Sequence, residues 1–284
     1  MSVLRIEANG PLDVRAAIAT LVNHEIAGLT ETRPDELSHR RIVELEDGPL
    51  EVIVRLDPAG VTVGSDLTVS GPEAVSGLVR GWFDLDSEIT AIDRHLGAQP
   101  RFSAQVRDRP GIRITGHPGA FESSILIVLG QQISLAAART FAARLVRAYG
   151  EKVGDLIRFP SPERLSMEPP DRLREEVGIP GARARTIGAV ASLFAELVGA
   201  KEATEASELI GRLAAVPGVG PWTTAYVSLR GLGLPDEFPA TDAVVRRALD
   251  GIASSEASAM AASWSPYRSY ATVRLWAEYA GAAA

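Results

Sequence analysis

The sequence predicts an α+β domain built on an antiparallel sheet, followed by a mainly α-helical domain. Strand-like patterns are confined to about the first 70 residues, helical patterns follow from Gly71 onward, and the charge balance differs between the two parts. The chain has 284 residues, 46% of them hydrophobic and 23% charged, which suits about two folded domains. We expect these domains to cover residues 1–110 and 111–284.

The first domain is predicted from alternating polar and apolar residues joined by short turns. Residues 3–7 alternate as in a strand, and residues 12–22 carry apolar side chains at helical spacing. Further strands are expected at residues 41–45, 50–56 and 61–69. The turn sequences between them, at 48–49 and 57–60, are short, which favours an antiparallel meander.

The second part is predicted to be helical, interrupted by proline and glycine, with no strand after Gly71. Pro221, Pro239 and Pro266 lie at or near expected helix starts, where a missing amide costs nothing. We expect Ser265 to cap the last helix. The expected helices cover residues 72–82, 86–96, 119–130, 134–149, 161–167, 170–176, 181–198, 205–215, 221–231, 241–250, 256–263 and 265–280.

The acidic surplus lies entirely in the first domain. Residues 1–110 contain 11 Arg and 18 Asp plus Glu, a balance of −7, whereas residues 111–284 contain 18 Lys plus Arg and 18 Asp plus Glu. This balance argues against tight, unspecific nucleic-acid binding through a basic surface. It leaves open a local phosphate site built from backbone amides, which adds no formal charge.

Composition excludes several kinds of site. The absence of cysteine excludes disulfides, thiolate zinc sites, iron–sulfur clusters and a cysteine nucleophile. His24, His39, His95 and His117 are scattered along the chain, so a multi-histidine metal site is not expected. No apolar run approaches the roughly 18 residues of a membrane span, and the N-terminus lacks the apolar stretch of a signal peptide. We therefore expect a cytoplasmic protein with no membrane partner.

The segment LAAVPGVGPW, residues 213–222, has the pattern of a helix-hairpin-helix motif. Gly218 and Gly220 permit positive φ and close backbone approach, and Pro221 begins a new helix. The free amides of the turn and of the next helix start suit a phosphate, without reading a base. The alternative is an ordinary turn between two helices.

The segment FPATD, residues 238–242, precedes an apolar-periodic helix. Thr241 or Asp242 is expected to cap that helix. A carboxylate at a helix N-terminus is also stabilised as the anion, and it could face a cationic, oxocarbenium-like sugar. The two roles are compatible.

Aromatic and amide side chains supply the remaining candidates. Trp276 shares a helix face with the small residues Ser269 and Thr272, and Trp222 and Tyr226 lie one turn apart on another helix. These rings either belong to the core or line a pocket for a flat or cationic base. Gln131 and Gln132 occupy a turn, either as solvated residues or as a wedge that fills the space of an extruded nucleotide.

These segments together resemble the helix-hairpin-helix DNA glycosylase superfamily, and within it the AlkA-like 3-methyladenine DNA glycosylases II. The resemblance covers about residues 119–280, in the family's order, and is weak at residue level in the first domain. Its matching segments are GQQIS (130–134), VGIPGARARTI (177–187), LAAVPGVGPWTTAYVSLRGLG (213–233), FPATD (238–242) and WSPYRSYATVRLW (264–276).

The resemblance implies a monomeric, monofunctional glycosylase of base excision repair that flips an alkylated purine from double-stranded DNA and hydrolyses its N-glycosidic bond. Asp242 would be catalytic, and Trp222, Tyr226 and Trp276 would line the base pocket. Trp222 stands where bifunctional relatives carry a Schiff-base lysine, so no lyase activity is expected. The implied DNA contacts are the wedge Gln132, where the family often has an aliphatic residue, and Pro217, Gly218, Val219, Gly220 and Thr223.

The resemblance also implies that no cofactor or metal takes part in the chemistry. The backbone carbonyls of Ala214, Val216 and Val219 match those that hold a monovalent cation beside the DNA phosphate. Arg183, Arg185 and Arg268 are further phosphate candidates. Two alternatives stay open: a catalytically silent DNA-binding module, and a glycosylase for oxidised purines or mismatched adenine. The lesion, whether 3-methyladenine, 7-methylguanine, hypoxanthine or ethenoadenine, is left open as well.

Overall fold

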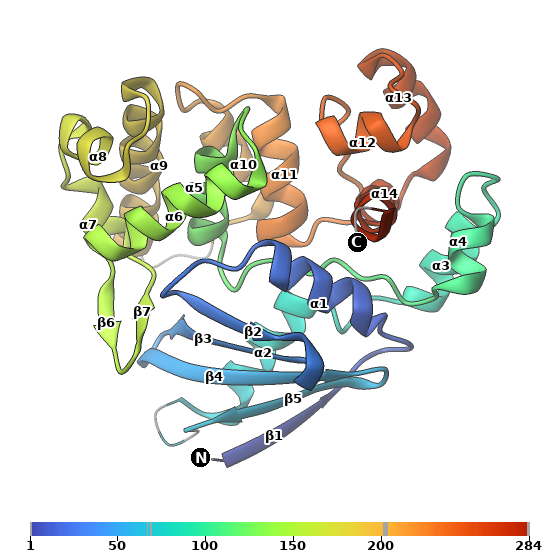
Figure 1. Ribbon diagram of the computed structural model, residues 1–284, viewed down its shortest axis with the longest axis horizontal. Helices are drawn as coiled ribbons and strands as arrows, with labels where there is room; N and C mark the ends of the chain where they lie inside the picture. Colours follow the sequence, from blue (N-terminus) through green and yellow to red (C-terminus); the bar gives the residue numbers. More distant parts are fainter. Residues whose placement is uncertain (1, 67, 69, 201–203, 283–284) are drawn as a thin grey trace.

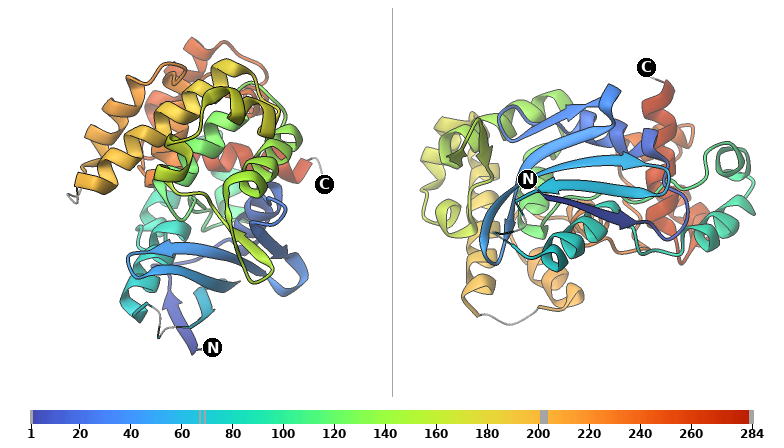
Figure 2. Two further views of the ribbon diagram at one scale, coloured as in Figure 1. Left: turned by 90° about the vertical axis from the view of Figure 1, so that its left-hand side faces the viewer. Right: turned by 90° about the horizontal axis from the view of Figure 1, so that it is seen from below.

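The computed structural model describes residues 2–66, 68, 70–200 and 204–282, in which one antiparallel sheet lies beneath a larger group of helices (Figures 1 and 2). Its strand order is β1-β5-β4-β3-β2, and every neighbouring pair is antiparallel. The predicted meander is therefore confirmed. The strands are β1 (Ser2–Glu7), β2 (Thr30–Arg33), β3 (Ser38–Leu45), β4 (Gly48–Asp57) and β5 (Gly60–Ser65).

The sheet differs from the prediction at two strands. Strand β2 was not predicted, because its sequence Thr-Glu-Thr-Arg has no apolar alternation; it forms by pairing with the start of β3, with Thr30 opposite Arg41. Strand β5 ends at Ser65, and two residues of the predicted strand 61–69, Leu67 and Val69, lie outside the described residues.

The helices follow the predicted order, with different bounds at some ends. Helix α4 was not predicted, and the last helix begins at Arg268 rather than at residue 265. Ser265 does not cap it but donates a hydrogen bond to Asp236 Oδ2 at 2.8 Å. The helices are α1 (Val14–Asn23), α2 (Pro72–Phe83), α3 (Ile89–Gly97), α4 (Ser103–Asp108), α5 (Ala120–Gly130), α6 (Leu135–Tyr149), α7 (Pro162–Ser166), α8 (Pro170–Val177), α9 (Gly181–Ala200), α10 (Ala206–Ala214), α11 (Pro221–Leu232), α12 (Ala243–Ala248), α13 (Ser254–Ala261) and α14 (Arg268–Ala282), with 3₁₀ turns η1 (Pro34–Glu36) and η2 (Ala262–Trp264).

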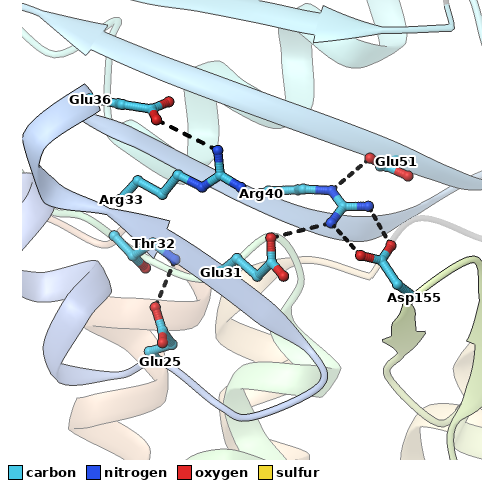
Figure 3. A network of polar contacts seen from close by, with 8 residues as sticks. All are labelled: Glu25, Glu31, Thr32, Arg33, Glu36, Arg40, Glu51 and Asp155. Carbon is cyan, nitrogen blue, oxygen red and sulfur yellow. Dashed lines mark hydrogen bonds and ion pairs between the residues drawn. The ribbon is translucent and has the colours of Figure 1, made fainter.

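The expectation of no strand after Gly71 is wrong, because a small hairpin of β6 (Glu151–Val153) and β7 (Leu156–Arg158) reaches down to the sheet (Figure 1). Its turn residue Asp155 receives two hydrogen bonds from Arg40 of β3, at 2.6 and 2.9 Å (Figure 3). The same guanidinium also bonds Glu31 and Glu51 on the neighbouring strands. Strands of three residues are too short for a recognisable alternation, so partners from the sheet decide this element.

Three apolar clusters form the core. One joins the sheet to α1 and α2, and a second lies among α5 to α11. The third brings α3 and α4 together with α12 to α14 around the buried Trp264 and Tyr270. Helices α3 and α4 precede residue 110 in the sequence but pack with the C-terminal helices. The boundary at that residue stays a prediction.

Three of the four histidines, His24, His39 and His117, meet at the interface between the sheet and the helices. They line an internal cavity together with Arg230 and with Glu122, which forms a buried ion pair with Arg41. Sequence separation thus did not keep these histidines apart. No group of three or more His, Asp or Glu side chains among the described residues is arranged to hold a metal ion.

We expect these three histidines, of which His39 is buried and His24 and His117 are partly exposed, to make the protein less stable in mild acid. Burial lowers the pKa of His24 and of His39 to about 3, with smaller contributions from Arg230 and Arg41 respectively, and burial also lowers the pKa of His117. The unfolded chain, with histidine pKa values near 6.5, then binds more protons than the folded chain. Below pH 6.5, the free energy of unfolding should fall by up to about 1.4 kcal/mol per pH unit for each such histidine.

Urea unfolding between pH 7.5 and 5 measures this slope. His39→Gln should reduce this slope, because it removes one of these imidazoles from the cavity. A free energy of unfolding that is flat between pH 6.5 and 5 would contradict the prediction.

None of the described helices is both long and apolar enough to cross a membrane.

Candidate active site and nucleic-acid interface

Asp242 caps helix α12, as one of the two candidates predicted there. Its Oδ1 accepts hydrogen bonds from the backbone amides of Val244 and Val245, both at 3.0 Å. The side chain is nearly buried, with the residue 8% exposed. This geometry satisfies two amides of the helix start and fixes the orientation of the carboxylate.

Two tryptophans complete the shell of donors around the same carboxylate. The indole Nε1 of Trp276 donates to Oδ1 and that of Trp222 donates to Oδ2, each at 3.1 Å. The carboxylate thus accepts four hydrogen bonds, three at Oδ1 and one at Oδ2. Residues of three helices, far apart in the sequence, are brought together here.

The predicted aromatic residues form one stack beside Asp242. The Tyr226 ring centroid lies 5.1 Å from that of Trp222 and 4.9 Å from that of Trp276. All three residues are partly exposed. Ser269 and Thr272, which share the helix face of Trp276, are buried; Ser269 accepts from the Glu237 amide and donates to the Leu234 carbonyl.

Arg230 is a site residue that the sequence analysis missed. It lies one turn beyond Tyr226 on α11, and its Cζ is 4.8 Å from the Trp276 ring centroid. The spacing 222, 226, 230 places all three side chains on one face of that helix, and this spacing was the signal that could have identified it. Its guanidinium donates to the carbonyl of Thr115.

The predicted hairpin lies between α10 and α11, and its turn is held by hydrogen bonds. The Val219 amide donates to the Val216 carbonyl at 3.0 Å. Gly218 has φ of +92°, and a Cβ there would lie 2.1 Å from Thr186 Oγ1. That hydroxyl, on α9, donates to the Pro217 carbonyl at 2.9 Å. Gly218 is therefore required both by its backbone conformation and by the close approach of α9.

The two turn glutamines have different surroundings. Gln131 Nε2 donates to the Gly218 carbonyl and to Thr223 Oγ1, both at 2.9 Å, and Arg183 donates to the Gln131 carbonyl. Gln132 has φ of +56° and is exposed. Gln131 therefore ties the α5–α6 turn to the hairpin, whereas Gln132 points its side chain into solvent beside it.

The arginines proposed to contact phosphate also differ. Arg185 is exposed and Arg183 is partly exposed. Arg268 donates to both oxygens of Asp236, at 2.8 and 2.9 Å. Its charge is already paired, so Arg268 is less suited to a phosphate than the other two.

Comparison with known proteins gives two family matches, the AlkA N-terminal domain over residues 3–121 and the HhH-GPD superfamily base excision DNA repair protein over residues 125–263. The chain is 36% identical over 286 residues to a probable bifunctional transcriptional activator/DNA repair enzyme AlkA of Mycobacterium tuberculosis. That match covers 96% of the chain but 56% of the relative, so the chain spans little more than half of that protein's length.

Two further comparisons involve proteins nearer to the chain in length. DNA-3-methyladenine glycosylase 2 of Escherichia coli is 34% identical over 200 residues, which cover 68% of each chain. The solved structure of a 3-methyladenine DNA glycosylase from Archaeoglobus fulgidus superposes with a TM-score of 0.81 at 21% identity, covering 96% of both chains. At that identity the structural similarity establishes the fold alone.

Proposed function

Because the chain belongs to the AlkA-like DNA-3-methyladenine glycosylase family of base excision DNA repair, we propose that it removes alkylated purines from double-stranded DNA. The reaction is hydrolysis of the N-glycosidic bond by a monomeric, monofunctional enzyme. One observation carries the proposal: a carboxylate held by two indole N–H groups at the edge of an aromatic stack.

The proposed chemistry moves one electron pair from the sugar to the base. The C1′–N bond breaks with its electrons on the base, and C1′ becomes cationic and oxocarbenium-like. Asp242 stabilises this cation and orients the attacking water, which forms the new C–O bond. The surplus proton goes to solvent when a cationic base leaves neutral, and to the base when a neutral base leaves as an anion.

The aromatic stack supports a base that has left the helix. Trp222, Tyr226 and Trp276 offer ring faces and edges for stacking, which is worth about 1–3 kcal/mol per base. Methylation at purine N3 or N7 makes the base cationic and weakens its bond to the sugar, so a pocket with a single carboxylate suffices.

The hairpin is proposed to hold the DNA backbone. Pro217, Gly218, Val219 and Gly220 would present backbone amides to a phosphate, and Gln132 would fill the gap that the flipped nucleotide leaves. Thr223 is buried, and its hydroxyl accepts a hydrogen bond from Gln131. Thr223 therefore supports the hairpin and offers no exposed hydroxyl to DNA. Its proposed contribution to DNA binding is therefore indirect.

We further propose that the carbonyls of Ala214, Val216 and Val219 hold a monovalent cation. Ala214 is the last residue of α10, and Val216 and Val219 lie in the turn that follows, which is closed by the bond from the Val219 amide to the Val216 carbonyl; all three carbonyls are neutral oxygen ligands. A cation there would add positive charge beside a DNA phosphate. No other cofactor is proposed.

We expect DNA binding to weaken only gently with salt. The proposed interface uses backbone amides and two exposed or partly exposed arginines, so the slope of log K against log salt should correspond to a few phosphates. Fluorescence anisotropy with a lesion duplex at 50 to 300 mM salt measures it. A slope typical of a strongly basic protein would count against this interface.

No lyase activity is proposed, because the position two residues after Gly220 is Trp222 rather than lysine. Incubation with methylated duplex DNA, followed by separate analysis of free base and of strand breaks, tests both the glycosylase activity and the absence of lyase activity. Release of base without nicking supports the proposal. A catalytically silent DNA-binding module would bind the duplex and release nothing.

A further inference from the structure

A buried positive charge lies against the aromatic stack. Arg230 is 6% exposed, and its Cζ lies 4.8 Å from the centroid of the Trp276 ring. Within the described parts of the chain, no carboxylate lies within 4.0 Å of its guanidinium, and its Nε has no hydrogen-bond partner. Its described hydrogen bond goes to the Thr115 carbonyl.

Other buried arginines of the protein are paired with a carboxylate or lie away from the aromatic stack. Arg41 is paired with Glu122, and Arg274 with Asp93. Arg113 is bonded to backbone carbonyls, among them those of Pro11 and Ser87, away from the stack. Arg230 is thus a buried cation whose field acts on the Trp276 ring and on whatever stacks beside it.

The position of this charge matters because of the direction in which electrons move. When the C1′–N bond breaks, the base gains one unit of negative charge and the sugar becomes cationic. Asp242 lies at one edge of the Trp276 ring, through the indole Nε1, and Arg230 lies over its face. A fixed cation beside the base and a fixed anion near the sugar both favour this shift.

We propose that Arg230 is a specificity-determining residue that weakens binding of cationic bases and stabilises electrons arriving on the departing base. The proposal rests on the glycosylase function proposed above. It means that Arg230 extends the activity to neutral lesions such as hypoxanthine or ethenoadenine, which leave as anions. Lesions such as 7-methylguanine are cationic before cleavage and neutral after it. For them the gain in rate from Arg230 is offset by weaker binding of the cationic base, so they need this residue less.

The expected size of the effect of Arg230 on binding and on rate follows from the distance between its guanidinium and the base. A base stacked on Trp276 lies about 9–12 Å from the guanidinium, because Arg230 Cζ is 4.8 Å from the Trp276 centroid and aromatic neighbours have centroids about 4.5–7 Å apart. Two unit charges at that separation, with an effective dielectric constant near 20, alter an equilibrium or a rate by about 10- to 20-fold.

The test is Arg230→Gln, which removes the charge and keeps an N–H donor for the Thr115 carbonyl. Single-turnover kinetics on a hypoxanthine duplex and on a 7-methylguanine duplex give a rate and a half-saturation concentration for each. We expect the rate to fall about tenfold or more on both lesions. The half-saturation concentration should fall by a similar factor for 7-methylguanine only. The ratio of rate to half-saturation concentration should therefore fall about tenfold for hypoxanthine and stay unchanged for 7-methylguanine, so that the selectivity, which is the first ratio divided by the second, drops about tenfold.

Two variants serve as controls. Arg230→Lys keeps the charge and should retain the wild-type selectivity. Arg113→Gln removes another buried, carbonyl-bonded arginine, and should lower stability without changing the selectivity. Equal changes in half-saturation concentration for both lesions, or an unchanged selectivity in Arg230→Gln, would overturn the proposal.

A binding experiment on the wild-type protein covers the case in which Arg230→Gln does not fold. Duplexes with 2′-fluoro-7-methylguanosine and with its neutral isostere 7-methyl-7-deazaguanosine differ in the charge of the base. The wild type should bind the neutral isostere at least as tightly. Binding of the cationic base more than about tenfold tighter would overturn the role of Arg230. If the wild type releases neither hypoxanthine nor 7-methylguanine, the proposed function fails, whereas this comparison still tests Arg230.

Discussion

Replacing Asp242 with asparagine is expected to lower the rate of base release by at least about 100-fold while leaving DNA binding within a few-fold of wild type. An amide cannot stabilise a cationic sugar through a full negative charge. It also places an NH₂ group against an indole N–H, so that one of the bonds from Trp222 and Trp276 is lost. Single-turnover base release and anisotropy binding measure the two quantities.

Asp13→Asn is a control for the helix-capping role in which an ion pair with Arg109, at 2.8 Å, is removed as well. Asp13 caps α1, and its carboxylate accepts from the Ala16 amide at 2.9 Å, as Asp242 accepts from Val244 and Val245. It lies outside the aromatic stack, so its variant should lose some stability and keep full activity. Full activity in Asp242→Asn would mean that Asp242 is a cap and nothing more.

Replacing Gly218 with alanine is expected to disrupt the hairpin and to weaken DNA binding by more than about tenfold. The added Cβ would lie 2.1 Å from Thr186 Oγ1, at a φ of +92° that L-residues rarely adopt. The turn or the Thr186 side chain must then shift, which breaks the bond from Thr186 to the Pro217 carbonyl and disturbs the bond from Gln131 to the Gly218 carbonyl. The measurements are thermal unfolding and duplex binding.

Two other glycines separate backbone strain from DNA approach. Gly211→Ala on α10 has no neighbour within 4 Å and should leave binding intact, with a slight gain in stability from helix propensity. Gly220→Ala also has open space and should fold normally; its binding falls only if the DNA backbone comes close to this residue. Normal duplex binding by Gly218→Ala would contradict the role given to the hairpin.

Features that depend on neighbouring residues were predicted from the sequence. The antiparallel meander followed from alternation and short turns, and the helix start at Pro221 and the choice of Thr241 or Asp242 as a cap followed from local hydrogen-bonding needs. The resemblance to a family added what local patterns do not contain, namely that the cap, the hairpin and the aromatic rings belong to one site.

Short elements that depend on distant partners were not predicted. Strand β2 pairs through a polar sequence, and the β6–β7 hairpin is held at its turn by Arg40, 115 residues away. The two adjacent glutamines look equivalent in sequence, yet Gln131 bonds the hairpin while Gln132 is exposed. These outcomes depend on strand pairing and tertiary contacts that the local sequence patterns do not contain.

The sequence by itself therefore determined the order of the longer elements, the hairpin and the choice of Thr241 or Asp242 as the cap, because each is set by interactions within a few residues. Only the tertiary structure brought Trp222 and Trp276 to the same carboxylate, gathered three histidines at one interface, and left the charge of Arg230 without an acidic partner among the described residues. Burial and charge pairing arise between segments far apart along the chain, so no local pattern records them.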